Sequence, residues 1–160
     1  MKPHITKEAL RELFNYIDGE FIYKKTMGRG SKAQKGDKAG WISSWDRYKQ
    51  ITIHKRKYKL HRLIYVYHYD IIPEPMQIDH IDGDRLNNKI ENLRMVTYQE
   101  NCWNKKATKG YFYCKRTDKY RVQLAVNNKK IEIGRFSTSE EAREAYLEAK
   151  KIHHNIPNRQ

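Results

Sequence analysis

The chain has 160 residues and a formal net charge of +14 at pH 7, with 33 Lys and Arg against 19 Asp and Glu. The positive charge is concentrated in residues 24–62 and 102–136, which carry +11 and +8. Charge concentrated in this way favours a polyanionic partner, and a surface kept soluble by its charge is the alternative. The two cysteines form no Cys-x-x-Cys pair, and these residues contain nothing like a secretory h-region or a run of about 18 apolar residues. We therefore expect a soluble, cytoplasmic protein without structural disulfides, built as one medium domain or two small ones.

The first 60 residues are predicted to hold one helix and several strands. Apolar residues recur first at helical spacing and then in alternation, and clusters of glycine or basic residues interrupt them. The predicted elements are a helix over 7–17 with Thr6 as its N-cap and Gly19 after its end, a strand at 21–23, a flexible basic loop at 28–32, and a basic hairpin over 48–60 with Ile51 and Ile53 on one face.

The next segment is predicted to run helix, strand, long loop, strand, helix. Residues 61–69 are apolar enough for a buried helix that closes before Pro73. Two strands follow, at 76–80 and 94–96, with a turn at 82–84 between them. Thr97 and Glu100 have the spacing of a capping box, so a helix begins there and carries Asn101 near its first turn.

Residues 107–160 are predicted to form a second module after a basic linker at 105–110. The expected elements are strands at 111–113, 120–126 and 130–133, turns at 118–119 and 127–128, and a helix from the capping box Thr138–Glu141 whose apolar face holds Ala142, Ala145, Tyr146, Ala149 and Ile152. In the central strand, the period of two turns Val122 toward the helix and leaves Arg121 and Gln123 on the open face.

Residues 76–101 form an acidic island in this basic chain, with five Asp or Glu against three Lys or Arg. Asp79 and His80 are neighbours on a predicted strand, so their side chains leave on opposite faces. Asn101 returns on a helix and can add an amide oxygen beside the carboxylate of Asp79, a pair that suits Mg²⁺ or Mn²⁺ and not structural zinc. Because an imidazole has an ordinary pKa near 6.5, His80 is a candidate general base for activating water.

Each of these features has a simpler explanation. An Asp-His pair at a strand end is often an ordinary surface turn, and Asn101 can be a polar residue of a first helical turn. The run Asp82-Gly83-Asp84 suggests a calcium loop, but the remaining EF-hand positions do not follow. The combination of residues, rather than any one of them, indicates a nuclease centre.

Motif runs follow one another in order from residue 60 to residue 101. They are Leu60-His61-Arg62-Leu63, Ile78-Asp79-His80-Ile81-Asp82-Gly83-Asp84, Asn87-Asn88, Ile90-Glu91-Asn92-Leu93-Arg94, Val96-Thr97 and Glu100-Asn101. Together they resemble the HNH endonucleases of phages and mobile introns. The resemblance implies an α+β protein with a nuclease domain over 1–106, made of an N-terminal helix and basic hairpin in 1–60 and a ββα-metal (His-Me finger) core in 61–106.

The same resemblance implies roles for four residues. His80 would be the general base, and Asn92 would brace the loop that bears it. Asp79 and Asn101 would be ligands of one Mg²⁺ or Mn²⁺ ion in the active site. Asn101 departs from the many family members with His at this position, and an amide favours a hard ion over Zn²⁺ or Ni²⁺.

Residues 108–153 carry a second set of motifs. They are Lys109-Gly110-Tyr111, Lys119-Tyr120-Arg121-Val122-Gln123-Leu124, Ile133-Gly134-Arg135-Phe136 and Glu140-Glu141-Ala142-Arg143-Glu144-Ala145-Tyr146. These runs resemble the APETALA2-type DNA-binding domain, which implies a small three-stranded antiparallel sheet plus one helix in residues 107–160. Tyr120 stands where that family usually shows Trp, and Phe112 and Tyr113 replace arginines of the first strand.

Candidate DNA contacts lie in both predicted domains. Arg121 and Gln123 have the strongest claim to base edges, because the period of two places them together on the open sheet face. The full set of candidates is Lys49, Arg56, Lys57, His61, Arg62, Arg94, Lys115, Arg116, Lys119, Arg121, Gln123, Lys130 and Arg135.

These patterns predict a metal-dependent DNA endonuclease, site-specific and of the phage homing type, that nicks or cuts double-stranded DNA. The alternative is a non-catalytic, sequence-specific DNA-binding protein built on the same folds, and intact Asp79, His80, Asn92 and Asn101 argue against it. An RNA-binding module, with Tyr111 to Tyr113 as stacking platforms, is a third option. We expect neither a membrane partner nor a small-molecule substrate. A homodimer would supply two active sites. The cytoplasm of a bacterial host suits a phage-encoded enzyme.

Overall fold

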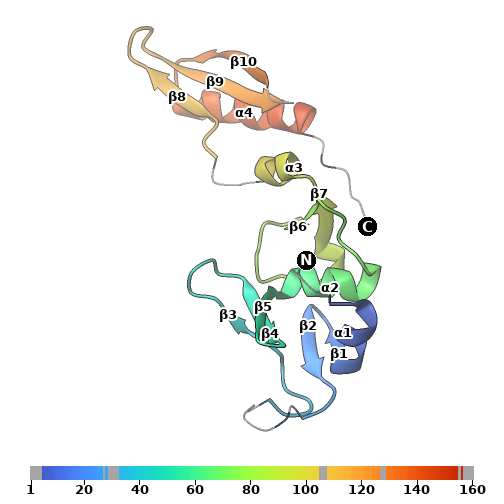
Figure 1. Cartoon of the computed structure of the whole chain (residues 1–160). Helices are drawn as coiled ribbons and strands as arrows, with labels where there is room; N and C mark the ends of the chain where they lie inside the picture. Colours follow the sequence, from blue (N-terminus) through green and yellow to red (C-terminus); the bar gives the residue numbers. More distant parts are fainter. Residues whose placement is uncertain are drawn as a thin grey trace. The chain divides into compact units, whose positions relative to one another are not determined.

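The computed structural model describes residues 5–26, 28, 33–104, 108–126, 129–154 and 156, and it is a mixed α+β structure of small antiparallel sheets and helices (Figure 1). The chain divides into two compact units, one up to Asn101 and one from Cys102. The predicted basic loop at 28–32, the start of the linker at 105–107 and the turn at 127–128 lie wholly or largely outside the described residues. No helix in the described part of the chain is long and apolar enough to cross a membrane.

The first unit begins with a helix and a hairpin. The helix α1 (Lys7–Leu13) has Thr6 as its N-cap, and Thr6 Oγ1 accepts a hydrogen bond from Ala9 N. Strands β1 (Phe14–Ile17) and β2 (Glu20–Tyr23) then pair antiparallel across a turn at Asp18 and Gly19.

The prediction that this helix extends to Ile17 is therefore wrong. Phe14 is already extended, with φ −133°, and its pairing with Tyr23 replaces the helical hydrogen bonds. Asp18 and Gly19 both have positive φ, as a two-residue hairpin turn requires. A Cβ on Gly19 would lie 2.9 Å from the backbone nitrogen of Lys89, so glycine also permits the close approach of the 88–89 segment.

A second small sheet and a buried helix follow. The sheet has the order β3 (Trp41–Ile42), β4 (Lys49–Ile53), β5 (Arg56–Lys59), and Ile51 and Ile53 are buried as predicted. The helix α2 (Leu60–Tyr69) presents Leu60, Leu63, Ile64 and Tyr65 to the core. The core of this unit also contains Leu10, Phe14, Phe21 and Leu93, so helices, hairpin and sheet share one apolar interior.

The last part of the first unit carries the predicted site. Strand β6 (Gln77–His80) pairs antiparallel with β7 (Leu93–Val96), and a short 3-10 turn, η1 (Ile90–Asn92), precedes β7. Helix α3 (Tyr98–Trp103) begins at the predicted capping box: Glu100 N donates to Thr97 Oγ1 (3.2 Å) and Thr97 N donates to the Glu100 carboxylate (2.8 Å).

The second unit is one sheet with one helix. Its strands have the order β10 (Lys129–Phe136), β9 (Lys119–Val126), β8 (Tyr111–Cys114), and α4 (Ser139–His153) packs on them with a complete capping box at Thr138 and Glu141. Val122, Leu124, Ala142, Tyr146 and Ala149 form its core. The prediction that Ile152 lies on the buried face is wrong: Ile152 is 71% exposed, because it lies in the last turn of α4, beyond Ala149, the last buried residue of the helix.

Candidate active site

His80 lies at the end of β6, where the strand meets the loop to η1, and is only 3% exposed. Its Nε2 is 3.2 Å from Asn88 Oδ1. The ring of His61, on α2, meets the His80 ring edge-to-face with centroids 4.8 Å apart, and the ring of Tyr48 is 6.0 Å away. One helix and two loops thus contact this imidazole.

The environment of His80 favours a neutral imidazole with a defined tautomer. Burial lowers the pKa of His80, and the hydrogen bond to Asn88 and the carboxylates of Asp79, Asp82 and Asp84 only partly oppose that shift. Asn88 Nδ2 donates to the carbonyl of Leu86 (3.1 Å), which orients Asn88 Oδ1 as the acceptor toward His80. His80 Nε2 is then the protonated nitrogen, and Nδ1 carries the lone pair that can accept a proton from water.

Asn92 connects the two ends of the loop that follows His80. Its Oδ1 accepts from Asp82 N (3.1 Å), and its Nδ2 donates to Asp82 Oδ1 (3.0 Å) and to the carbonyl of Asn87 (2.8 Å). Asn87 Nδ2 donates to the second oxygen of Asp82 (2.7 Å). Burial opposes the shift, but the hydrogen bonds from Asn87 and Asn92 lower the pKa of Asp82. Asn92 therefore stabilises the loop conformation that presents Asn88 to His80.

Asp79 forms a buried ion pair with Arg94 on the neighbouring strand. The register of β6 and β7 places the two residues directly opposite each other, and each is 9% exposed. Arg94 donates from Nη2 (3.1 Å) and Nε (3.3 Å) to Asp79 Oδ2. Arg94, a predicted DNA contact, thus lies inside the site against the predicted metal ligand.

Asn101 lies on the same face of β6 as Asp79. Asn101 Nδ2 donates to Gln77 Oε1 (2.7 Å), and side chains two apart on a strand share a face about 7 Å apart. This hydrogen bond leaves Asn101 Oδ1 as the oxygen able to act as a ligand. Within the described residues there is no group of three or more His, Cys, Asp or Glu that could hold a metal. A carboxylate and an amide oxygen instead fit a hard ion that keeps several waters and a phosphate oxygen.

The remaining DNA-contact candidates of the first unit differ in exposure. Arg56, Lys57 and Arg62 are exposed. Lys49 forms an ion pair with Glu20. His61 is 4% exposed, so the structure places it in the interior beside His80 rather than at the surface.

The open face of the second sheet contains a carboxylate between two arginines. Glu132 pairs with Arg121 and, at 3.2 Å, with Arg135, and Arg121 lies 5.9 Å from the ring of Phe112. Gln123, directly opposite Glu132 in the register, is half-buried. The other candidates here are all exposed: Lys115, Arg116, Lys119 and Lys130.

Two residues of these sites were not singled out from the sequence. Asn88 contacts His80 directly, and the only local signal was its place in the Asn87-Asn88 pair of the quoted motif. Nothing in the sequence around Glu132 distinguishes it from other polar residues of a strand. Its position between Arg121 and Arg135 depends on how β9 and β10 pair.

Comparison with known proteins shows what the segment around this site is similar to. The family model described as HNH endonuclease matches residues 58–102, which contain His61, His80, Asn88, Asn92 and Arg94. An uncharacterized HNH endonuclease of Acanthamoeba polyphaga mimivirus is 33% identical over 93 residues, covering 56% of this chain and 50% of that protein. A protein of the SPbeta prophage of Bacillus subtilis (strain 168), named as an HNH homing endonuclease, is 46% identical over 46 residues, 29% of this chain and 27% of that protein.

The chain therefore spans half or less of the length of these relatives. No solved structure matches the chain. The family match covers β6, β7 and most of α3, the elements that carry His80, Asp79 and Asn101. Residues 58–102 are accordingly similar to an HNH endonuclease domain.

Proposed function

We propose that the chain is a metal-dependent DNA endonuclease that hydrolyses phosphodiester bonds, of the site-specific homing type found in phages. The observation that carries this proposal is the setting of His80: a buried imidazole, hydrogen-bonded by Asn88, within the segment that matches the HNH family. The name of the prophage relative supports the homing type.

In this proposal His80 removes a proton from the water that attacks phosphorus. Its pKa, lowered by burial, keeps the imidazole unprotonated at neutral pH, and with Nε2 bonded to Asn88 the proton would be accepted at Nδ1. Arg94 holds the carboxylate of Asp79 in place. Asp79 and Asn101 would hold a Mg²⁺ or Mn²⁺ ion, which when bound stabilises negative charge on the phosphate and on the leaving oxygen.

We propose further that residues 107–160 are an APETALA2-like DNA-binding domain that lengthens the recognised site. The order of three antiparallel strands and one helix supports this reading. Exposed basic residues on the strands and their turn would contact phosphates, and Arg121 and Gln123 would reach base edges. Release of Glu132 from Arg121 and Arg135 would accompany such contacts, since a carboxylate there repels the DNA backbone.

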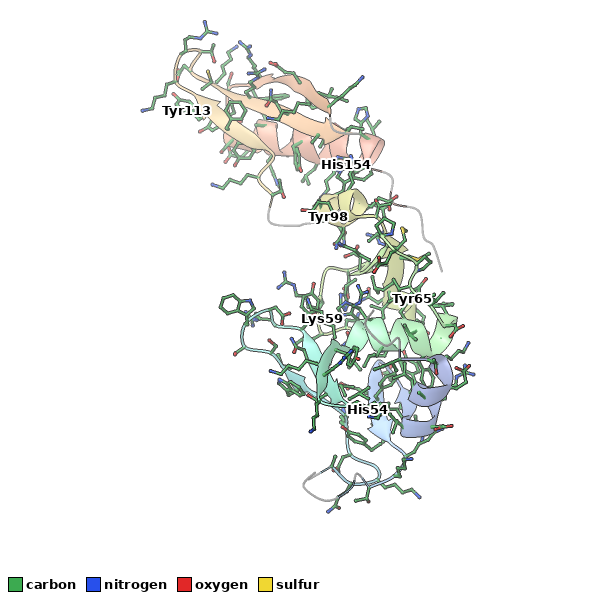
Figure 2. The ribbon with its side chains drawn as sticks, viewed as in Figure 1. His54, Lys59, Tyr65, Tyr98, Tyr113 and His154 are labelled. Atoms are coloured by element: carbon green, nitrogen blue, oxygen red, sulfur yellow. The ribbon has the colours of Figure 1, made fainter. Side chains whose placement is uncertain are left out.

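The proposal is tested by incubating the full chain with supercoiled plasmid and Mg²⁺ and resolving supercoiled, nicked and linear forms. His80→Ala should abolish cleavage and leave DNA affinity, measured by fluorescence anisotropy, nearly unchanged. A matched control is His54→Asn, because His54 is an exposed histidine in the β4–β5 turn, labelled in Figure 2, and Asn tolerates its positive φ. Cleavage by His80→Ala within about tenfold of the parent would reject His80 as the base.

A further inference from the structure

The loop between β3 and β4, residues 43–48, carries the most exposed aromatic side chain among the described residues. Trp45 is 95% exposed. Large aromatic side chains are usually at least half-buried, and a tryptophan left fully in water loses the favourable burial of its ring. Figure 1 shows this loop extending beyond the ends of its strands.

The Trp45 loop is closed by its own hydrogen bonds. Ser43 N donates to the carbonyl of Tyr48 (2.9 Å), and Arg47 N donates to the carbonyl of Ser43 (2.9 Å). Asp46 accepts from Tyr48 N and from Gln50 Nε2, both at 3.3 Å, and pairs with Lys59 at 3.2 Å. Burial favours a higher pKa for Asp46, but hydrogen bonds from Ser43, Tyr48 and Lys59 lower this pKa to about 2. The Asp46 carboxylate that closes the loop is therefore ionised at neutral pH.

The same loop is attached to the loop that follows His80. Arg85 Nη1 donates to the carbonyl of Asp46 (3.0 Å), and the Arg85 guanidinium lies 5.0 Å from the ring of Tyr48. The Tyr48 ring is in turn 6.0 Å from that of His80. Trp45 is thus adjacent in sequence to Asp46, whose carbonyl joins the Trp45 loop to the loop that follows His80.

We infer that Trp45 stacks on a nucleobase of the bound DNA next to the phosphodiester bond that is cleaved. This inference rests on the proposed function and adds to it a contact for a base, where His80 and its neighbours act on a phosphate. An indole face stacks on any base, so the contact tolerates sequence and favours steps that unstack easily.

Charge selects nucleic acid over a second copy of the chain as the occupant. Residues 24–62, which include the Trp45 loop, carry 13 Lys or Arg against 2 Asp. Lys57 lies 6.0 Å from the ring of Trp41 on the same sheet, and Lys59 and Arg85 flank Tyr48. Two such surfaces repel each other, whereas the phosphates on either side of a stacked base match them.

The experiment uses the full chain with Trp45 as its only tryptophan. Trp41→Phe and Trp103→Phe remove the others, with Phe keeping a ring against His154 at position 103, and His80→Ala keeps the DNA intact. Acrylamide quenching of Trp45 is measured with and without duplex DNA. We expect the quenching constant to fall severalfold and the emission to weaken when DNA binds, because stacking covers the indole.

The affinity of the full chain for duplex DNA supplies the second readout. Trp45→Ala should weaken DNA affinity by about tenfold, and Trp45→Phe should recover most of that loss, as expected for base stacking. Ile42→Ala is the matched control, since Ile42 is an apolar residue of the neighbouring strand β3 and is 56% exposed. It should change neither the acrylamide quenching of Trp45 nor the DNA affinity.

The outcomes separate this inference from the proposed function. If the parent chain neither binds nor cuts DNA, the proposed function fails, and the inference fails with it. If the parent binds and cuts DNA while Trp45 stays open to acrylamide and Trp45→Ala keeps full affinity, only the inference is overturned. Protection of Trp45 without DNA, with self-association in sedimentation, would assign the surface to a second copy and also overturn it.

Discussion

Replacing Asn88 by Ala is expected to slow cleavage without removing DNA binding. Asn88 is 2% exposed, and its Oδ1 lies 3.2 Å from His80 Nε2. Loss of this partner leaves a buried nitrogen unsatisfied, which costs about 1–3 kcal/mol in the free energy of unfolding. An imidazole that is no longer held in its orientation is expected to lose about 10- to 100-fold in the rate of the chemical step.

The pH dependence of cleavage distinguishes loss of this hydrogen bond from general destabilisation. Burial lowers the pKa of His80, and the Asn88 hydrogen bond raises it. Because the base must be unprotonated, activity falls as pH drops through this pKa. Asn88→Ala removes a contact that raises the pKa, so the acid limb should move to lower pH. Asn88→Asp keeps an acceptor and adds a negative charge, so its acid limb should move to higher pH.

The assay is the single-turnover cleavage rate of a labelled plasmid or duplex across a pH series, with unfolding in urea measured on the same variants. Asn87→Ala is the matched control, because the Asn87 amide donates to Asp82 and not to His80. It should lower the free energy of unfolding while leaving the acid limb in place. Acid limbs that coincide in the parent, Asn88→Ala and Asn88→Asp would refute the role given to Asn88.

Three further results are expected. Excess chelator should stop cleavage and Mg²⁺ or Mn²⁺ should restore it, and full activity in chelator would contradict the metal requirement. Asp79→Ala should lower the free energy of unfolding by about 3–5 kcal/mol, because Arg94 is left buried without its carboxylate. Burial, followed by the nearby charge of His80, lowers the pKa of His61 well below 6.5 in the folded chain. As pH falls, His61 is therefore protonated in the unfolded chain before it is protonated in the folded chain. Stability should therefore be lost as pH falls below about 6.5, and His61→Phe should reduce the slope of unfolding free energy against pH by up to about 1.4 kcal/mol per unit; an unchanged slope would contradict it. Removing residues 107–160 should leave a folded nuclease unit that binds DNA more weakly and with a smaller salt slope, and an unchanged slope would argue for another role of that segment.

Local sequence patterns were sufficient for much of the framework. The capping boxes at Thr97 and Thr138 depend on contacts three residues apart, and both form as predicted. The burial of Ile51 and Ile53 depends on the period of two within one hairpin. The segment that carries His80, Asn92 and Asn101 was found from the order of its motif residues, because these positions follow one another closely along the chain.

The sequence failed where a distant segment competes with a local preference. Phe14 to Ile17 continue the apolar spacing of a helix, but pairing with residues 20–23 stabilises them as a strand. Ile152 continues the apolar face of α4 past the last residue that the sheet covers. In both cases periodicity describes only the element itself, and the position of its neighbour decides burial.

The sequence by itself determined most of the elements and the order of the polar residues in the segment that resembles HNH endonucleases, since these depend on spacing along one stretch of chain. Only the tertiary structure decided how those residues are used: that Arg94 neutralises Asp79, that Asn88 and His61 hold His80, and that the loop of Trp45 is tied to the active-site loop by Arg85. These contacts join residues on different strands, helices and loops. Their distances depend on strand register and on the packing of α2 and the β3–β4 loop around His80, which no local period records.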